Sequence, residues 1–249
     1  MRPMMNYGQF WPIAKAAEIV AERWTPLVVH ELLAGSTHFS DIRRGVPLMS
    51  QTLLSQRLKE LERVGIVERR AKNPRRPEWQ LTDAGRALAP VIQQLGEWGL
   101  QYAQDPLRES DLGVTVLMWN IRRRVDPNVF GGSRVTVYFE FTDVPKGKRR
   151  WWVVNDRGSV DLCPIDPGFP VDIYITTDIR TMVHIWVAKL TLEAAVRSDR
   201  MEIVGPRALR DHLRAWFLLS PINMNTLSTA ARAAADRRSP ANAPAGAMV

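Results

Sequence analysis

A cluster of basic and amide side chains between Ser40 and Pro77 is the part of this sequence best suited to contact a polyanion. The segment holds ten basic and four acidic residues, whereas the whole chain of 249 residues has 34 basic and 26 acidic residues and a formal net charge of +8. Six of the eight net positive charges therefore lie between these two residues. Such dense positive charge favours a phosphate backbone as the partner.

A helix expected to begin after Ser50 presents side chains that can read the edges of bases. Leu54, Leu58 and Leu61 repeat at helical spacing and mark its buried face. A glutamine amide can make two hydrogen bonds to adenine in the major groove, and Arg or Lys can reach guanine or phosphate. The residues expected to contact DNA before and along this helix are Arg43, Ser50, Gln51, Thr52, Ser55, Gln56, Arg57 and Lys59.

Three further helices are expected to hold that helix in place. One carries apolar residues from Ile13 to Trp24, and a second begins at Thr25-Pro26. A short helix is expected over 39–44, just before the base-reading helix. Helix, short turn and helix in this order are typical of a helix-turn-helix.

A basic hairpin is expected to follow, with strands at 66–70 and 78–81. Its turn carries Lys72, Arg75 and Arg76, which can contact phosphates or enter the minor groove. Either a basic hairpin or a polar helix face alone is also typical of ordinary solvated surface. The combination of helix order, charge density and hairpin instead predicts a winged helix-turn-helix that binds DNA.

Several adjoining motifs resemble the HxlR-type family of bacterial transcriptional regulators over residues 8–103. They are Trp11-Pro12, Glu22–Thr25, Phe39–Arg43, Ser50–Glu62, Gly65–Val67 and Leu81–Gly85. The resemblance implies a homodimer on a palindromic or near-palindromic operator, with terminal helices such as Leu88–Trp98 building the dimer interface. Many members carry a cysteine where this chain has Trp11, so a thiol switch in this domain is excluded.

Residues 105–221 are expected to form a second, α+β domain. Alternation over 134–141 predicts a half-buried strand, with further strands at 150–155, 159–163, 171–176 and 201–204. Helices are expected at 179–188, 192–198 and 206–219, covering one face of the sheet. Arg122–Arg124 and Lys146–Arg150 are expected to be exposed charge, although either group could contact flanking DNA or an acidic ligand head. The tail from 222 to 249 is rich in Ala, Ser, Pro and Arg and is expected to be disordered.

This order resembles the sterol-carrier-protein type 2 fold over about residues 110–220. The marks are Trp152–Val154 before Asp156–Gly158, then Asp172–Thr177, Leu190–Ala195 and Glu202–Gly205. Ala188-Lys189 stands where the family commonly has a glycine. The resemblance implies an apolar tunnel for a lipid-like ligand, with candidate lining residues Phe139, Trp152, Tyr174, Trp186, Leu213 and Phe217. Large aromatic residues more often fill an ordinary core, so the tunnel and the core remain alternatives.

The expected function is a dimeric DNA-binding transcriptional regulator modulated by a lipid-like or small apolar ligand. The alternative is a lipid-binding carrier whose winged helix contacts proteins. No nucleophile–base set, metal motif or phosphate loop is apparent, so neither catalysis nor a cofactor or metal is expected. The single cysteine, Cys163, is expected to be an inert thiol. The first seven residues lack a signal peptide's apolar core, and no run of 18 apolar residues occurs, so a cytoplasmic location without membrane insertion is expected.

Overall fold

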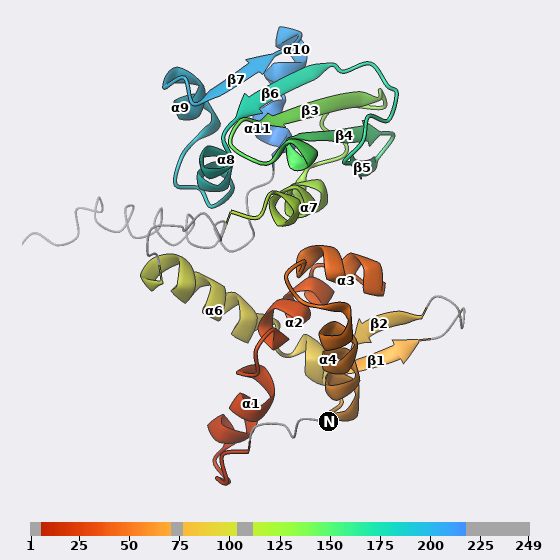
Figure 1. The fold of residues 1–249 in the computed structure, drawn as a ribbon, viewed down its shortest axis with the longest axis vertical. Helices are drawn as coiled ribbons and strands as arrows, with labels where there is room; N and C mark the ends of the chain where they lie inside the picture. Colours follow the sequence, from red (N-terminus) through yellow and green to blue (C-terminus); the bar gives the residue numbers. More distant parts are fainter. Residues whose placement is uncertain (1–5, 71–76, 104–111, 218–249) are drawn as a thin grey trace, which may run out of the picture.

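The computed structural model describes residues 6–70, 77–103 and 112–217, which form two domains (Figure 1). The turn with Lys72, Arg75 and Arg76, the boundary expected near residue 105 and the tail expected from residue 222 lie outside the described residues. The N-terminal domain contains a helical bundle with a two-stranded hairpin. The C-terminal domain contains a five-stranded sheet with helices, which confirms the α+β class.

The N-terminal helices begin and end where local sequence favours it. α1 (Pro12–Val20) and α2 (Thr25–Leu33) each have a proline in the first turn, where a missing N–H costs no hydrogen bond. α3 (Phe39–Gly45) is followed by α4 (Gln51–Arg63), which Ser50 caps by accepting a hydrogen bond from the Leu53 N–H at 3.2 Å. The expected helix-turn-helix is therefore present.

The hairpin consists of β1 (Val67–Arg70) and β2 (Glu78–Leu81), paired antiparallel. β2 also contacts the segment before α3, because the Trp79 N–H donates to the Thr37 carbonyl at 2.7 Å. Two helices follow the hairpin, α5 (Asp83–Arg86) and α6 (Ala89–Tyr102), and α6 contains most of the terminal helix expected at Leu88–Trp98. Leucines of α4 pack with residues of α2, α3, the hairpin and α6 in one apolar core, which fixes α4 against the rest of the domain.

The C-terminal domain is built on a mixed sheet with strand order β5-β4-β3-β6-β7. Only the central β3–β6 pair is parallel, and the other neighbours are antiparallel. The strands are β3 (Val135–Phe141), β4 (Arg150–Asp156), β5 (Ser159–Cys163), β6 (Ile173–Thr177) and β7 (Met201–Val204), with a short 3-10 helix η2 (Lys146–Lys148) before β4. These bounds agree closely with the strands expected from alternation and turn residues.

Helices cover one face of this sheet. α7 (Val114–Arg124), α8 (Ile179–Trp186) and α11 (Leu213–Trp216) share one apolar core with the inward residues of β3, β4 and β6. α9 (Leu192–Arg197) and α10 (Arg207–Arg210) flank β7 in the chain. Instead of the single helix expected over 206–219, the described residues form two short helices, α10 and α11. α7 was not expected from the sequence, and it lies between the sheet and the N-terminal domain (Figure 1).

Candidate nucleic-acid interface

α4 presents a continuous polar surface on the side opposite the core. Gln51, Thr52, Gln56 and Lys59 are exposed and Ser55 is half-buried, whereas the leucines at 54, 58 and 61 are at most 2% exposed. Ser50 is exposed but uses its hydroxyl oxygen as the helix cap. The arrangement gives one helix a rigid buried side and a free row of hydrogen-bonding side chains, which is what base reading in a major groove requires.

Arg57 does not belong to that row, and its expected role as a DNA contact is corrected. Its side chain is 8% exposed and lies between two glutamates. One terminal nitrogen donates to Glu22 of the segment between α1 and α2 at 2.9 Å, and the other donates to Glu60 of α4 at 2.7 Å. The guanidinium is thereby neutralised inside the domain and holds α4 to the α1–α2 connection.

Exposed basic residues lie in the elements that precede and follow α4 in the chain. Arg43, near the end of α3, is exposed, as are Arg69 and Arg70 at the end of β1. Arg70 is paired with Glu68 at 2.6 Å, while Arg43 and Arg69 have no carboxylate within 4.0 Å among the described residues. Free cations next to a polar helix face can contact phosphates on either side of a groove.

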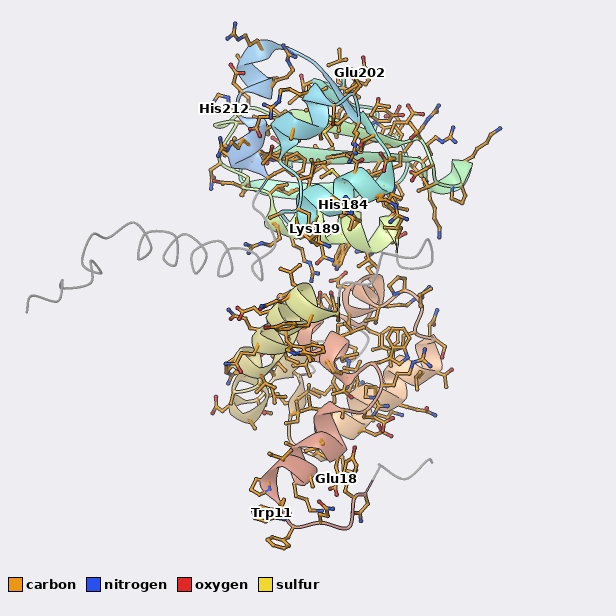
Figure 2. The ribbon with its side chains drawn as sticks, turned by 90° about the vertical axis from the view of Figure 1, so that its left-hand side faces the viewer. Trp11, Glu18, His184, Lys189, Glu202 and His212 are labelled. Atoms are coloured by element: carbon orange, nitrogen blue, oxygen red, sulfur yellow. The ribbon has the colours of Figure 1, made fainter. Side chains whose placement is uncertain are left out.

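Exposed apolar side chains gather on two other elements of this domain, α1 with the residues before it, and α6. Phe10 and Ile13 are 82% and 84% exposed, and Trp98 is 57% exposed, although such residues are normally buried. Figure 2 shows Trp11 at the end of the N-terminal domain farthest from the C-terminal domain. The exposed apolar residues in α1, in the residues preceding it, and in α6 are Tyr7, Phe10, Trp11, Ile13, Val91, Leu95, Trp98 and Tyr102. We call this set the α1/α6 surface.

Comparison with known proteins accounts for the N-terminal domain. Residues 19–106 match the family model described as HxlR-like helix-turn-helix. YvaP of Bacillus subtilis (strain 168), an uncharacterized HTH-type transcriptional regulator, is 42% identical over 101 residues, which span 39% of this chain and 94% of YvaP. The chain belongs to the HxlR-like helix-turn-helix family. It is therefore a DNA-binding transcriptional regulator.

Another relative is the HTH-type transcriptional regulator YodB of the same organism, 36% identical over 91 residues, or 36% of this chain and 81% of YodB. The solved structure of reduced YodB is 33% identical and covers 39% of this chain and 97% of that chain, with a TM-score of 0.34. YodB has also been solved in diamide-treated and quinone-bound forms. The single cysteine of this HxlR-like chain, Cys163, lies outside the matched domain, on β5.

The C-terminal domain lies outside the HxlR-like match, and the sheet register corrects the set of residues expected to line a ligand tunnel there. Phe139 and Leu213 are fully buried, and Phe217 packs edge-on against Phe139 with ring centroids 6.2 Å apart. Trp152 and Tyr174 instead lie in the row of Tyr138, on the opposite face of the sheet. Trp186 is half-buried against the core. The six expected residues therefore do not line one cavity, and three of them are ordinary core.

A groove lies elsewhere in this domain, among α9, β7, α10 and α11. It has a volume of about 490 Å³ and is lined by Leu192, Glu193, Val196, Arg197, Ile203, Arg207, Arg210, Asp211 and Arg214. Arg207 pairs with Asp211 at 3.7 Å and Arg214 with Glu193 at 4.0 Å. Arg197 and Arg210 are exposed and have no carboxylate within 4.0 Å in the described part of the chain. The groove thus combines an apolar wall with unneutralised positive charge.

The described residues also bear on metal binding, thiol reactivity and membrane-spanning helices. In these ranges no three His, Cys, Asp or Glu side chains are grouped to hold a metal ion. Burial and the nearby Asp161 raise the pKa of the Cys163 thiol, which disfavours the reactive thiolate. No helix within the described ranges is both long and apolar enough to cross a membrane.

Sequence reasoning missed a group of residues where the two domains meet. Arg123 was expected to be exposed charge, but its side chain is 11% exposed and pairs with Glu31 of α2. Trp119, also on α7, contacts the same carboxylate. The apolar spacing of Val114, Leu117, Met118 and Ile121 is the signal that would have predicted α7.

Proposed function

We propose that this chain binds a specific operator as a homodimer, with α4 of each protomer in the major groove. The exposed polar face of α4, backed by buried leucines, is the observation that supports it. A two-fold axis would place two such helices on the halves of a palindromic or near-palindromic site. The proposed contacts are Arg43, Ser50, Gln51, Thr52, Ser55, Gln56 and Lys59, with Lys72, Arg75 and Arg76 from the hairpin turn.

Fluorescence anisotropy across a salt series tests the proposed operator binding. The chain is titrated onto the intergenic DNA upstream of its own gene and onto a scrambled duplex. Gln56→Ala should lower affinity for the operator by about 1–3 kcal/mol and leave the scrambled duplex unaffected, because only base contacts discriminate sequence. Gln94→Ala, an exposed glutamine on α6, is the matched control. Weak binding that is equal on both duplexes would favour instead a carrier protein whose winged helix contacts proteins.

The α1/α6 surface supports the proposed homodimer. An apolar surface of this kind is unfavourable in water and is typical of protein–protein contacts. Trp98 and Tyr102 already pack against each other, with centroids 5.9 Å apart, and are available to a second copy. Sedimentation should give twice the chain mass of 28.3 kDa, and Trp98→Ser should weaken the dimer. Ile165→Ser, at a 78% exposed apolar residue of the C-terminal domain, should leave it intact.

We also propose that a small amphiphilic anion, carrying an apolar tail and a carboxylate or phosphate, modulates this regulator from the arginine-lined groove. Arginine binds both groups through paired hydrogen bonds, and Leu192, Val196 and Ile203 can cover the tail. Dansyl-undecanoate is a suitable fluorescent probe, with its methyl ester as the uncharged control and dodecyl phosphate as a competitor. Arg210→Glu should abolish binding of the acid. Equal binding of acid and ester would refute the ionic recognition.

A further inference from the structure

The two domains meet at a buried carboxylate that neither the DNA-facing surface nor the groove uses. Glu31, near the end of α2, has a side chain that is 4% exposed. The two terminal nitrogens of Arg123, on α7, donate to its two carboxylate oxygens at 3.0 Å each. Paired hydrogen bonds of this kind fix both the distance and the relative orientation of the partners.

Further donors complete the cluster. Ser36 Oγ donates to Glu31 Oε2 at 3.1 Å, and the Trp119 indole N–H donates to the same oxygen at 3.4 Å. Asn120 Oδ1 accepts a hydrogen bond from Arg123 at 2.7 Å. A buried charge is strongly unfavourable unless such partners satisfy it, so this set of contacts specifies one docked arrangement. We call Glu31, Ser36, Trp119 and Arg123 the Glu31 clamp.

α3, the first helix of the helix-turn-helix, contacts α7 beside the clamp. The Arg44 guanidinium lies over the Trp119 ring, 5.1 Å from its centroid, on a ring that is itself buried. The last residue of α3 is Gly45, and a Cβ at this position would overlap the Glu31 carboxyl group. The carboxylate can therefore occupy the clamp only because α3 ends without a side chain at this point.

α7 is in turn fixed within the C-terminal domain. Arg122 Nε donates to the Val160 carbonyl of β5 at 3.0 Å. Just past the same end of α7, the Asp126 N–H donates to the Trp216 carbonyl of α11 at 2.9 Å. α11 also carries Arg214, which lines the groove. These contacts connect α11, beside the groove, to α7, and α7 contacts α3 of the helix-turn-helix. Figure 1 shows α7 between the C-terminal sheet and α3.

We propose that α7 is the element that couples the C-terminal domain to the DNA-binding helices, and that the Glu31 clamp is the contact through which it acts. Docked and released forms of α7 would then hold α3 and α4 differently and bind DNA with different affinity. Coupling of this kind is reciprocal, so DNA bound at α4 must change the docking of α7. The inference rests on the proposed operator binding, but it needs no ligand to be tested.

Hydrogen–deuterium exchange of the full chain, with and without saturating operator duplex, measures that reciprocity. In the wild type, the operator should change exchange of the α7 amides, residues 114–124, by about threefold or more, and the scrambled duplex should not. Glu31→Gln and Arg123→Met should lose this response. Gly45→Ala should lose it too, because the new methyl group displaces the carboxylate without removing any charge.

Controls separate the clamp from general effects. Arg134→Met breaks a partly exposed pair with Asp156, of 47% and 30% exposure, and should keep the full response. Circular dichroism establishes that each variant is folded, and Arg123→Lys, which keeps the charge but loses the paired geometry, serves as a milder change. Tight operator binding with unchanged α7 exchange, or a full response in Gly45→Ala, would overturn the coupling. Failure of the wild type to prefer its operator would instead overturn the proposed function on which the coupling rests.

Discussion

Replacing Arg57 distinguishes a structural arginine from a DNA contact, because the two roles predict opposite results. In the structure its side chain is 8% exposed, and its guanidinium pairs with Glu22 and Glu60 at 2.9 and 2.7 Å. Arg57→Met keeps much of the side-chain volume but leaves both carboxylates without their cation. Removing one partner of a buried ion pair typically costs about 3–5 kcal/mol. Glu22 and Glu60 remain 27% and 20% exposed and can be rehydrated, so we expect a loss of about 2 kcal/mol.

Thermal unfolding and DNA binding measure the two roles separately. For a domain of this size, a loss of about 2 kcal/mol lowers the midpoint by about 8–16 °C. Below that temperature, the dependence of operator affinity on salt should match the wild type, since no phosphate contact is removed. Lys59→Met, an exposed cation two positions further along α4, should do the reverse: its stability changes by less than about 0.5 kcal/mol while the salt slope falls by about 1. An Arg57→Met variant of normal stability with a reduced salt slope would refute the reasoning.

Two titratable groups and one cap give further expectations. Burial, opposed by Glu31 and assisted by Arg123, lowers the pKa of His30 below its usual 6.5, so the unfolded chain takes up the proton first as pH falls. Urea unfolding should therefore show a free energy of unfolding that falls as pH drops below about 6.5 in the wild type, and this loss should be absent in His30→Gln. Burial and Asp161 raise the pKa of Cys163, so iodoacetamide should react slowly with the native chain near neutral pH. The Asp161→Asn variant should react faster, and equal reaction rates of the variant and the wild type would exclude the role of Asp161. Ser50→Ala removes the hydroxyl that caps α4 and should cost about 1 kcal/mol, whereas Ser50→Asp, which can still cap, should recover most of it in the same unfolding assay.

Periodicity predicted most elements of both domains, because local spacing alone decides which face of a helix or strand is apolar. The strands at 159–163 and 201–204 have the expected bounds, and the leucines of α4 are buried as their spacing indicates. The same spacing also indicates that Arg57 is buried and is not a DNA contact. Arg57 lies three residues after Leu54 and four before Leu61, on the buried side of the helix. It was nevertheless predicted as a DNA contact because of its positive charge.

Features that depend on pairing between distant segments could not be predicted in this way. Phe139 and Trp152 point to opposite faces of the sheet because Tyr138, and not Phe139, is the register partner of Trp152. A shift of one residue would have placed both on the same face, and nothing in either strand alone fixes that register. The expected set of tunnel-lining residues is wrong for this reason, and not because the strands were misplaced.

The arginines show why a charge count overstates the DNA-binding surface. Within the basic segment, Arg57 is neutralised by two glutamates, Arg70 pairs with Glu68, and Arg44 pairs with Asp41 and lies over Trp119 of the other domain. Arg123 likewise pairs inside the molecule, with a glutamate 92 residues away in the chain. In sequence Arg123 cannot be told apart from an exposed cation, because its carboxylate partner is supplied only by the tertiary fold. The net charge therefore indicates the class of partner, whereas the positions of the carboxylates decide which arginines can reach it and which hold the two domains together.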